Sequence, residues 1–426
     1  MKKVLRFLCL TTVCLAFVST GLGQITTEIG PGVVSNPGSI NIFSAPGFAS
    51  NLRLRVGGAT LTGGGTVTLS GNNSGIDDAS GTQTLTIGNQ TIQGVGNIGR
   101  NTANFVNEFN GLVDANVDGE TLFIDPAGSF INDGTLRASG GGILQLLDAG
   151  TVDFVNEDGT IEALNGSVVL LTTNARIEGG ELITAGTGQF RVGVNQTATL
   201  EDLTLDGPLV GENLSNTIIS DEIVSTSSID IVSTTNGATD LVVAAGGATL
   251  TGGGTVTLSG INPRIVDATG TQTLTIVDHT IQGSGNIGFN TTDFVNQMDG
   301  LIDANVDGET LFIDPAGSFI NDGTLRASGG GILELRDAGA VDFDNAGTIE
   351  ALEDSEVLLT TSARIEGGLL RTTGNGQFRV GVNQTATIED LTLNGPLMGD
   401  DLSRTIIADE IINTCLLYTS PSPRDS

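Results

Sequence analysis

The stretch FINDGTLRA (residues 130–138) decides the fold, because variants of it recur at short and regular intervals. It returns as FVNEDGTIEA at residues 154–163 and, with a different turn, as FVNEFNGLVDA at residues 105–115. Each copy holds Phe, an aliphatic residue and Asn, followed by Gly, an aliphatic residue, a polar residue and Ala. Apolar and polar residues alternate, which is the period of a strand with one buried face. The copies therefore predict equivalent short strands about 23 to 25 residues apart.

A much longer repeat contains these short ones. Residues 114–144 recur unchanged as residues 303–333, and similarity at the same offset of about 189 residues extends from residue 39 to residue 226. One short strand cannot bury its apolar face, but similar coils stacked about 4.8 Å apart pair their strands and close a continuous core. We therefore predict an all-β fold: a right-handed parallel β-helix, or β-solenoid, that forms a single elongated rod of about 18 coils. Two near-identical repeats of about 189 residues build it, at residues 24–226 and 227–414.

Stacking assigns a direction to each side chain of the short repeat. Phe105, Phe130 and Phe154 are expected to stack inside, and Asn107, Asn132 and Asn156 to form an amide ladder at a bend. The residues between the inward aliphatic and Ala positions must then point outward. Those residues are Asp114, Arg137 and Glu162, and in the second repeat Asp303, Arg326 and Glu350. Opposite charges on adjacent strands attract, so we expect an exposed column of ion pairs.

The two ends of the chain differ from the rest in composition. Residues 1–23 have Lys2, Lys3 and Arg6 before a short apolar run and small residues, which is typical of a secretory signal peptide. The apolar run is too short to span a bilayer. Residues 415–426, CLLYTSPSPRDS, hold the only Tyr, and the repeat similarity stops there. This end resembles the translation of a sequencing adapter, so we expect the natural chain to continue beyond Thr414.

Composition limits the partners that this chain can bind. The net charge is −32, and no lysine occurs between the two ends. Such a surface repels nucleic acid and attracts divalent cations diffusely. We predict a secreted or cell-surface location, no membrane insertion in this part, and partners such as an extracellular matrix or another cell surface.

The rungs NDGTLRA and NEDGTIEA resemble those of filamentous-haemagglutinin-like adhesins and autotransporter passenger domains. The resemblance covers residues 105–171 and 294–359. It implies a parallel β-helix and a structural or adhesive role.

A calcium-binding loop is the main alternative for one segment. DANVDGETLFID (residues 114–125, and again 303–314) has the oxygen-bearing residues and the Gly of an EF-hand loop. Pro126 and Gly128 would break the helix that must follow it. We therefore expect a solvated acidic turn, with weak calcium candidates at Asp114, Asn116, Asp118, Asp125, Asp303, Asn305, Asp307 and Asp314.

Catalytic and cofactor sites have little support in the sequence. The GxGxxG spacing of residues 94–99 and 283–288 lacks the helix that a dinucleotide site needs, so we expect glycine bends and no cofactor. His279 is the only His, and Gln90 replaces it in the first repeat. Carboxylates with Arg, such as Asp114 and Arg137, could cleave polysaccharides, but the Trp and Tyr platforms that sugar rings favour are missing. We predict a non-catalytic structural or adhesin-like rod, with a secreted polysaccharide lyase or glycoside hydrolase as the alternative.

Overall fold

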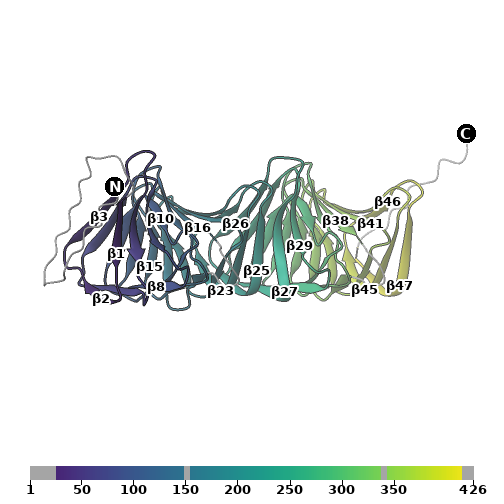
Figure 1. The fold of residues 1–426 in the computed structure, drawn as a ribbon. Coiled ribbons are helices and arrows are strands. Elements are labelled where there is room, and N and C mark those ends of the chain that lie inside the picture. Colours follow the sequence, from purple (N-terminus) through teal and green to yellow (C-terminus); the bar gives the residue numbers. More distant parts are fainter. Residues whose placement is uncertain (1–24, 148–153, 337–342, 415–426) are drawn as a thin grey trace, which may run out of the picture. The chain divides into compact units, whose positions relative to one another are not determined.

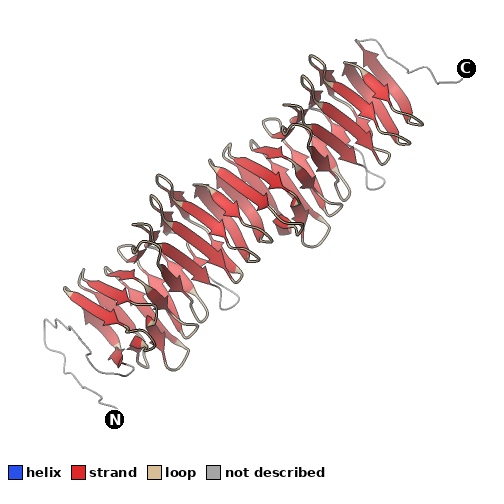
Figure 2. Ribbon diagram, turned by 90° about the horizontal axis from the view of Figure 1, so that it is seen from above, coloured by secondary structure: helices blue, strands red, loops and turns tan. Residues whose placement is uncertain are grey.

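The computed structural model describes residues 25–147, 154–336 and 343–414. The predicted signal peptide and the adapter-like end lie outside these residues. The described residues form strands, turns and bends, without a helix (Figure 2). Accordingly, this part of the chain offers no helical segment with the length and apolarity needed to cross a bilayer. The predicted all-β class is confirmed.

Parallel pairing links each strand to an equivalent strand one coil later. Phe105 lies beside Phe130, and Phe130 beside Phe154, so one coil takes about 24 residues. The strands stack as a β-solenoid of about 16 turns, fewer than the predicted 18. The difference arises because the turns lengthen each coil beyond the 22 residues on which the prediction was based.

The chain divides into two compact units, with the boundary between Arg191 and Val192. In the first unit every coil contributes one strand to each of three faces, and the strands within a face are parallel. Figure 1 shows these strands following one another along the unit. The first face holds β1 (Ile25–Ile29), β4 (Ser50–Leu54), β7 (Ser74–Asp78), β10 (Gly96–Ile98), β13 (Thr121–Ile124), β16 (Ile143–Leu147) and β19 (Val168–Thr172). The second holds β2 (Gly32–Ser35), β5 (Ala59–Thr62), β8 (Gln83–Ile87), β11 (Ala103–Asn107), β14 (Phe130–Asn132), β17 (Phe154–Val155) and β20 (Ala175–Glu178). The third holds β3 (Ser39–Phe43), β6 (Thr66–Ser70), β9 (Thr91–Gly94), β12 (Leu112–Ala115), β15 (Thr135–Ala138), β18 (Thr160–Ala163) and β21 (Glu181–Thr184).

The second unit repeats this arrangement, and β22 (Gln189–Val192) lies at the boundary. Its long strands β23 (Thr197–Asp206), β25 (Asn216–Ser225), β27 (Thr239–Thr251), β45 (Thr385–Asn394) and β47 (Arg404–Asn413) each serve two faces. One face holds β29 (Pro263–Asp267), β32 (Gly285–Ile287), β35 (Thr310–Ile313), β38 (Ile332–Arg336), β41 (Glu356–Thr360), β44 (Gln377–Val380) and β46 (Leu397–Gly399). The next holds β30 (Gln272–Ile276), β33 (Thr292–Asn296), β36 (Phe319–Asn321), β39 (Phe343–Asn345) and β42 (Arg364–Glu366). The last holds β24 (Leu209–Gly211), β26 (Ser228–Ser233), β28 (Thr255–Gly260), β31 (Thr280–Gly283), β34 (Leu301–Ala304), β37 (Thr324–Ala327), β40 (Thr348–Ala351) and β43 (Leu369–Thr372).

The predicted internal ladders are present. Phe105, Phe130 and Phe154 are buried, and their ring centroids are 5.6 and 5.8 Å apart along the stack. Beside them Asn107 donates from Nδ2 to Oδ1 of Asn132 at 2.8 Å, and Asn132 donates to Asn156 at 2.6 Å. Each amide thus bonds the next coil where the chain bends, which satisfies its donor group; Asn107 Oδ1, at the end of this ladder, is buried without a hydrogen-bond partner among the described residues.

The glycine-rich segment at residues 94–99 is a bend between strands. Gly94 ends β9, and Gly96 begins β10, both with positive φ angles. A Cβ atom on Gly94 would lie 2.0 Å from the carbonyl oxygen of Leu69 on the preceding coil. Glycine is required here by the close approach of two backbones.

Candidate functional site

The calcium candidates do not converge on one point. Asp114 lies within β12, and its carboxylate accepts hydrogen bonds from Arg137 Nη2 at 2.6 Å and Ser139 Oγ at 2.8 Å. Both of its oxygens are therefore engaged by the neighbouring coil. Asp118 is exposed in the turn before β13, and Asp125 follows that strand.

The second copy has the same arrangement. Asp303 accepts from Arg326 Nη2 at 2.6 Å and from Ser328 Oγ at 2.8 Å, and Asp307 is exposed in the turn. Asn116 and Asn305 are partly buried at the start of their turns. Within the described ranges, no group of three or more His, Cys, Asp or Glu side chains could hold a metal ion. Strand β13 lies between Asp114 and Asp125, the first and last ligand positions of the motif. The next element is the strand β14, where an EF-hand needs a helix.

The predicted charge column exists, but three of its four acidic members, Asp114, Asp303 and Glu350, are buried. Arg137 pairs with Asp114 at 2.6 Å and with Glu162 at 3.6 Å, in the expected order along neighbouring strands. Asp114 and Asp303 are each only 4% exposed. The expectation of a freely exposed column was therefore wrong, because the Arg and Ser side chains of the next coil close over each Asp.

The second unit extends this column by one residue. Glu350 is buried between Arg326 and Arg371, and Arg371 donates to its carboxylate. The corresponding neighbour of Glu162 in the first unit is Ile183. The two repeats thus differ at outward positions while they share the same core.

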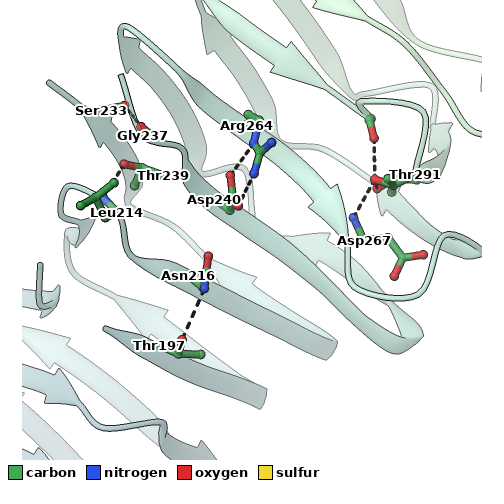
Figure 3. Close-up of polar contacts among 12 residues, drawn as sticks. Thr197, Leu214, Asn216, Ser233, Gly237, Thr239, Asp240, Arg264, Asp267 and Thr291 are labelled. Carbon is green, nitrogen blue, oxygen red and sulfur yellow. Dashed lines mark hydrogen bonds and ion pairs between the residues drawn. The ribbon is translucent and has the colours of Figure 1, made fainter. Parts of the chain in front are cut away.

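Further ion pairs on the strand faces were not predicted from the sequence. Arg264 on β29 forms a two-point ion pair with Asp240 on β27, at 2.8 and 2.7 Å (Figure 3). In the first unit Arg53 on β4 pairs with Asp77 on β7. The two pairs occupy different positions along their strands. Repeat alignment could not reveal them, because neither pair is preserved in the other repeat.

His279 occupies a buried site without hydrogen bonds. Its side chain is 0% exposed, and neither ring nitrogen has a hydrogen-bond partner. Nδ1 lies 3.5 Å from Oδ1 of Asp278. Burial lowers the pKa of His279, and the neighbouring carboxylate of Asp278 only partly opposes this. An enclosed imidazole whose ring nitrogens have no hydrogen-bond partner fits a structural position.

One hollow of about 470 Å³ gathers charged and neutral polar groups on the second unit. We call it the second-repeat hollow; its lining residues are Asn290, Asp314, Glu334, Arg336, Thr360, Thr361 and Gln384. Arg336 and Thr360 are register partners on β38 and β41. Asp314 directly follows Ile313, the residue paired with Leu335, so it lies on the coil next to Arg336.

The charged groups of this hollow are held in place by their neighbours. Arg336 Nε donates to Glu334 Oε1 at 2.7 Å, and Thr360 Oγ1 donates to the same oxygen at 2.8 Å. The guanidinium carbon of Arg336 lies 4.0 Å from the centre of the Phe312 ring. Burial raises the pKa of Asp314; the positive charge of Arg336 lowers it, and the negative charge of Glu334 raises it further.

The sequence flagged only one residue of this hollow, Asp314, and for a different role. The seven lining residues come from turns and strands of five successive coils. Repeat alignment does not single out the charged members, because Asp314 lies on another coil and the Glu334–Arg336 pair of β38 is replaced by Gln145 and Leu147 in the first repeat. Comparison with known proteins adds no assignment: the chain matches no protein-family model, no curated protein and no solved structure.

Proposed function

We propose that this protein is a non-catalytic structural solenoid of the cell exterior, with an adhesin-like role. The observation that supports it best is that inward side chains of successive coils stack on one another in ladders. The described core consists of stacked aliphatic, Phe and Asn residues with short turns between strands. Such repetition provides a stable, extended surface, which suits a spacer or a display scaffold.

Export and surface attachment rest on the sequence. The basic and apolar pattern of residues 1–23 supports secretion, and the rung resemblance supports an adhesive relative of the autotransporter passengers. The high negative charge supports a matrix or cell-surface partner over nucleic acid.

The alternative is an enzyme that acts on polysaccharides. One observation favours it: the second-repeat hollow holds two carboxyl groups and an arginine, and the pKa of one of them, Asp314, is raised by burial. Paired carboxyl groups with different pKa values can act as acid and base in glycoside cleavage. The hollow is lined by turns and strand ends, and its described lining residues include no Trp or Tyr, which favours the non-catalytic role.

Two measurements on the full chain test this proposal. Expression in a secreting bacterial host is expected to yield an exported protein whose N-terminus, read by mass spectrometry, lies near Gln24. Incubation with neutral and acidic polysaccharides is expected to release neither reducing ends nor unsaturated products. Retention of the uncut chain inside the cell would contradict export, and sustained product release that is lost in Asp314→Asn would establish the enzyme instead.

A further inference from the structure

We propose that Asn236 is a self-modification site, at which the chain slowly converts its own asparagine to aspartate and isoaspartate. This goes beyond the structural role proposed above and does not depend on it. Asn236 precedes Gly237 in the turn between β26 and β27 of the second unit, and Figure 3 shows Gly237 in this turn. Glycine shields its backbone nitrogen less than any other residue, because it has no Cβ atom.

The reaction at this pair needs only water. The Gly237 nitrogen attacks Cγ of Asn236, so a new N–C bond forms while the bond from Cγ to Nδ2 breaks. The proton of the glycine N–H is lost to solvent, and Nδ2 takes up a proton and leaves as ammonia. The product is a five-membered succinimide ring. Water then adds to either of its two carbonyl carbons, which gives aspartate or isoaspartate.

The structure leaves both reacting groups free. The Asn236 side chain is exposed, and neither this side chain nor the backbone nitrogen of Gly237 has a hydrogen-bond partner among the described residues. The turn around them is held by Ser233, whose Oγ donates to the carbonyl oxygens of Thr235 and Gly237 at 3.2 and 3.0 Å (Figure 3). The Asn236 side chain can therefore turn toward the Gly237 nitrogen without breaking a hydrogen bond.

The chain has four other Asn–Gly pairs, and each of them is restrained. In three pairs the glycine nitrogen already donates a hydrogen bond: Gly111 to the Glu108 carbonyl at 2.6 Å, Gly166 to Thr187 Oγ1 at 3.0 Å, and Gly376 to the Thr373 carbonyl at 3.0 Å. In the fourth pair, Asn394–Gly395, the glycine is buried, so its N–H is shielded from the solvent that must take the proton. Asn236–Gly237 is the pair without either restraint.

Asn165–Gly166 is the closest match to the proposed site, because both residues are exposed in a turn. Thr187 on the next coil holds both of them. Its Oγ1 donates to Asn165 Oδ1 at 2.9 Å and accepts from the Gly166 nitrogen, while its backbone nitrogen donates to the same Oδ1 at 3.1 Å. One hydroxyl thus restrains both reacting groups, and Thr187 is itself exposed, so its replacement should not disturb the core.

The conversion changes the turn that leads into β27. Aspartate adds one negative charge, and isoaspartate routes the main chain through Cβ, which lengthens the turn. The next strand begins with Thr239 and Asp240, both buried, so a longer turn must be absorbed between Ser233 and Thr239. We therefore expect faster hydrogen exchange in this turn after conversion, with the rest of the second unit unchanged.

The test incubates the full folded chain in mildly alkaline buffer and follows each Asn–Gly pair by peptide mapping with mass spectrometry. Asn236 should convert about tenfold faster than Asn165, because the restrained pair must first break hydrogen bonds. Thr187→Val should accelerate the conversion of Asn165 by about the same factor and leave Asn236 unchanged. In urea, where the restraints are lost, the difference between the two sites should largely disappear.

Three results would each overturn the proposal. They are conversion of Asn236 no faster than that of Asn165, a rate difference that persists in urea, and no acceleration of Asn165 in Thr187→Val. The urea arm also separates local sequence from structure, since the dipeptides are the same in the unfolded chain. The structural role is unaffected by any of these results, because export and the absence of cleavage test it separately.

Discussion

Arg137 closes over Asp114: its Nη2 atom lies 2.6 Å from Oδ2 of the carboxylate, one coil away along the stack. The contact leaves Asp114 only 4% exposed although it points away from the core. The hydrogen bond that Arg137 donates to Asp114 raises the pKa of Arg137, and burial partly opposes this. An outward position in a solenoid can therefore be as enclosed as an inward one when the next coil carries a long side chain.

This relationship sets the expected effect of Arg137→Ala. Removal of the guanidinium leaves a covered carboxylate without its cation, so we expect a loss of about 1–3 kcal/mol in the free energy of unfolding. A freely exposed pair would contribute only about 0.2–1 kcal/mol. Denaturant unfolding of the parent and variant measures the difference. Asp114→Asn/Arg137→Leu removes both charges and should recover part of the loss; an equal or larger loss in this double variant would show that the carboxylate is not the cause.

The sequence predicted the inward ladders because they depend only on local alternation and on a fixed coil length. Phe130 and Asn132 stack on their counterparts wherever the register is kept, and the repeated motif sets that register. The enclosure of Asp114 could not be predicted in this way, since it depends on the rotamers of Arg137 and Ser139 on another coil. The second-repeat hollow was missed for the same reason. The residues that line it lie on five coils, so they come together only when those coils have stacked.

The Phe and Asn ladders should be the most sensitive positions of the first unit. Phe130→Ala leaves a cavity between two stacked rings and is expected to cost about 3–5 kcal/mol. Asn132→Ala breaks the amide chain on both sides and should cost about 1–3 kcal/mol. Ile131, between them, is 38% exposed, so Ile131→Ala should change stability by no more than about 0.5 kcal/mol. Comparable losses for all three variants in denaturant unfolding would refute the assignment of directions.

The acidic turns should not act as calcium sites. Asp118 and Asp307 are exposed, so Asp118→Asn/Asp307→Asn should leave the melting temperature nearly unchanged in calcium-free buffer. Millimolar calcium should stabilise slightly, with magnesium almost as effective, because both act as counter-ions to a surface of charge −32. Titration calorimetry with both ions decides the matter. Saturable binding of two calcium ions per chain that disappears in the double variant, with no equivalent for magnesium, would revive the loop.

Acid should loosen the turn held by Asp78. Burial alone would raise the pKa of Asp78, but hydrogen bonds from the Ser80 hydroxyl and from the amides of Ser80, Thr82 and Gln83 lower it to about 2. A depressed carboxyl pKa stabilises the folded state above the ordinary value of about 3.8, and this contribution is lost as the pH falls toward 2. Asp78→Asn should weaken the fold at pH 6 and flatten its pH dependence between pH 4 and 2. Hydrogen exchange at Thr82 and Gln83 reports the local opening; unchanged protection at pH 2 would contradict this account.

His279 should make the second unit less stable in mild acid, and the first repeat provides the matched comparison. Gln90, its counterpart, donates to the carbonyl oxygens of Asn36 and Thr62 at 2.9 and 2.8 Å and accepts from the Asn36 amide at 2.9 Å. The buried imidazole of His279 makes no such bonds, and burial lowers its pKa below the ordinary value of 6.5.

The unfolded chain therefore binds a proton below about pH 6.5 that the folded chain resists, and stability falls as the pH drops through that range. Asp278 is the one charged group whose influence on this pKa is resolved, and its effect is opposite and smaller. We expect His279→Gln to raise the melting temperature at pH 5.5 more than at pH 8. Gln90→His should lower it at both values and more steeply at pH 5.5. Melting curves of the three proteins at the two pH values test this directly, and a gain from His279→Gln that is the same at both would show that lost hydrogen bonds, and not protonation, set the cost of this histidine.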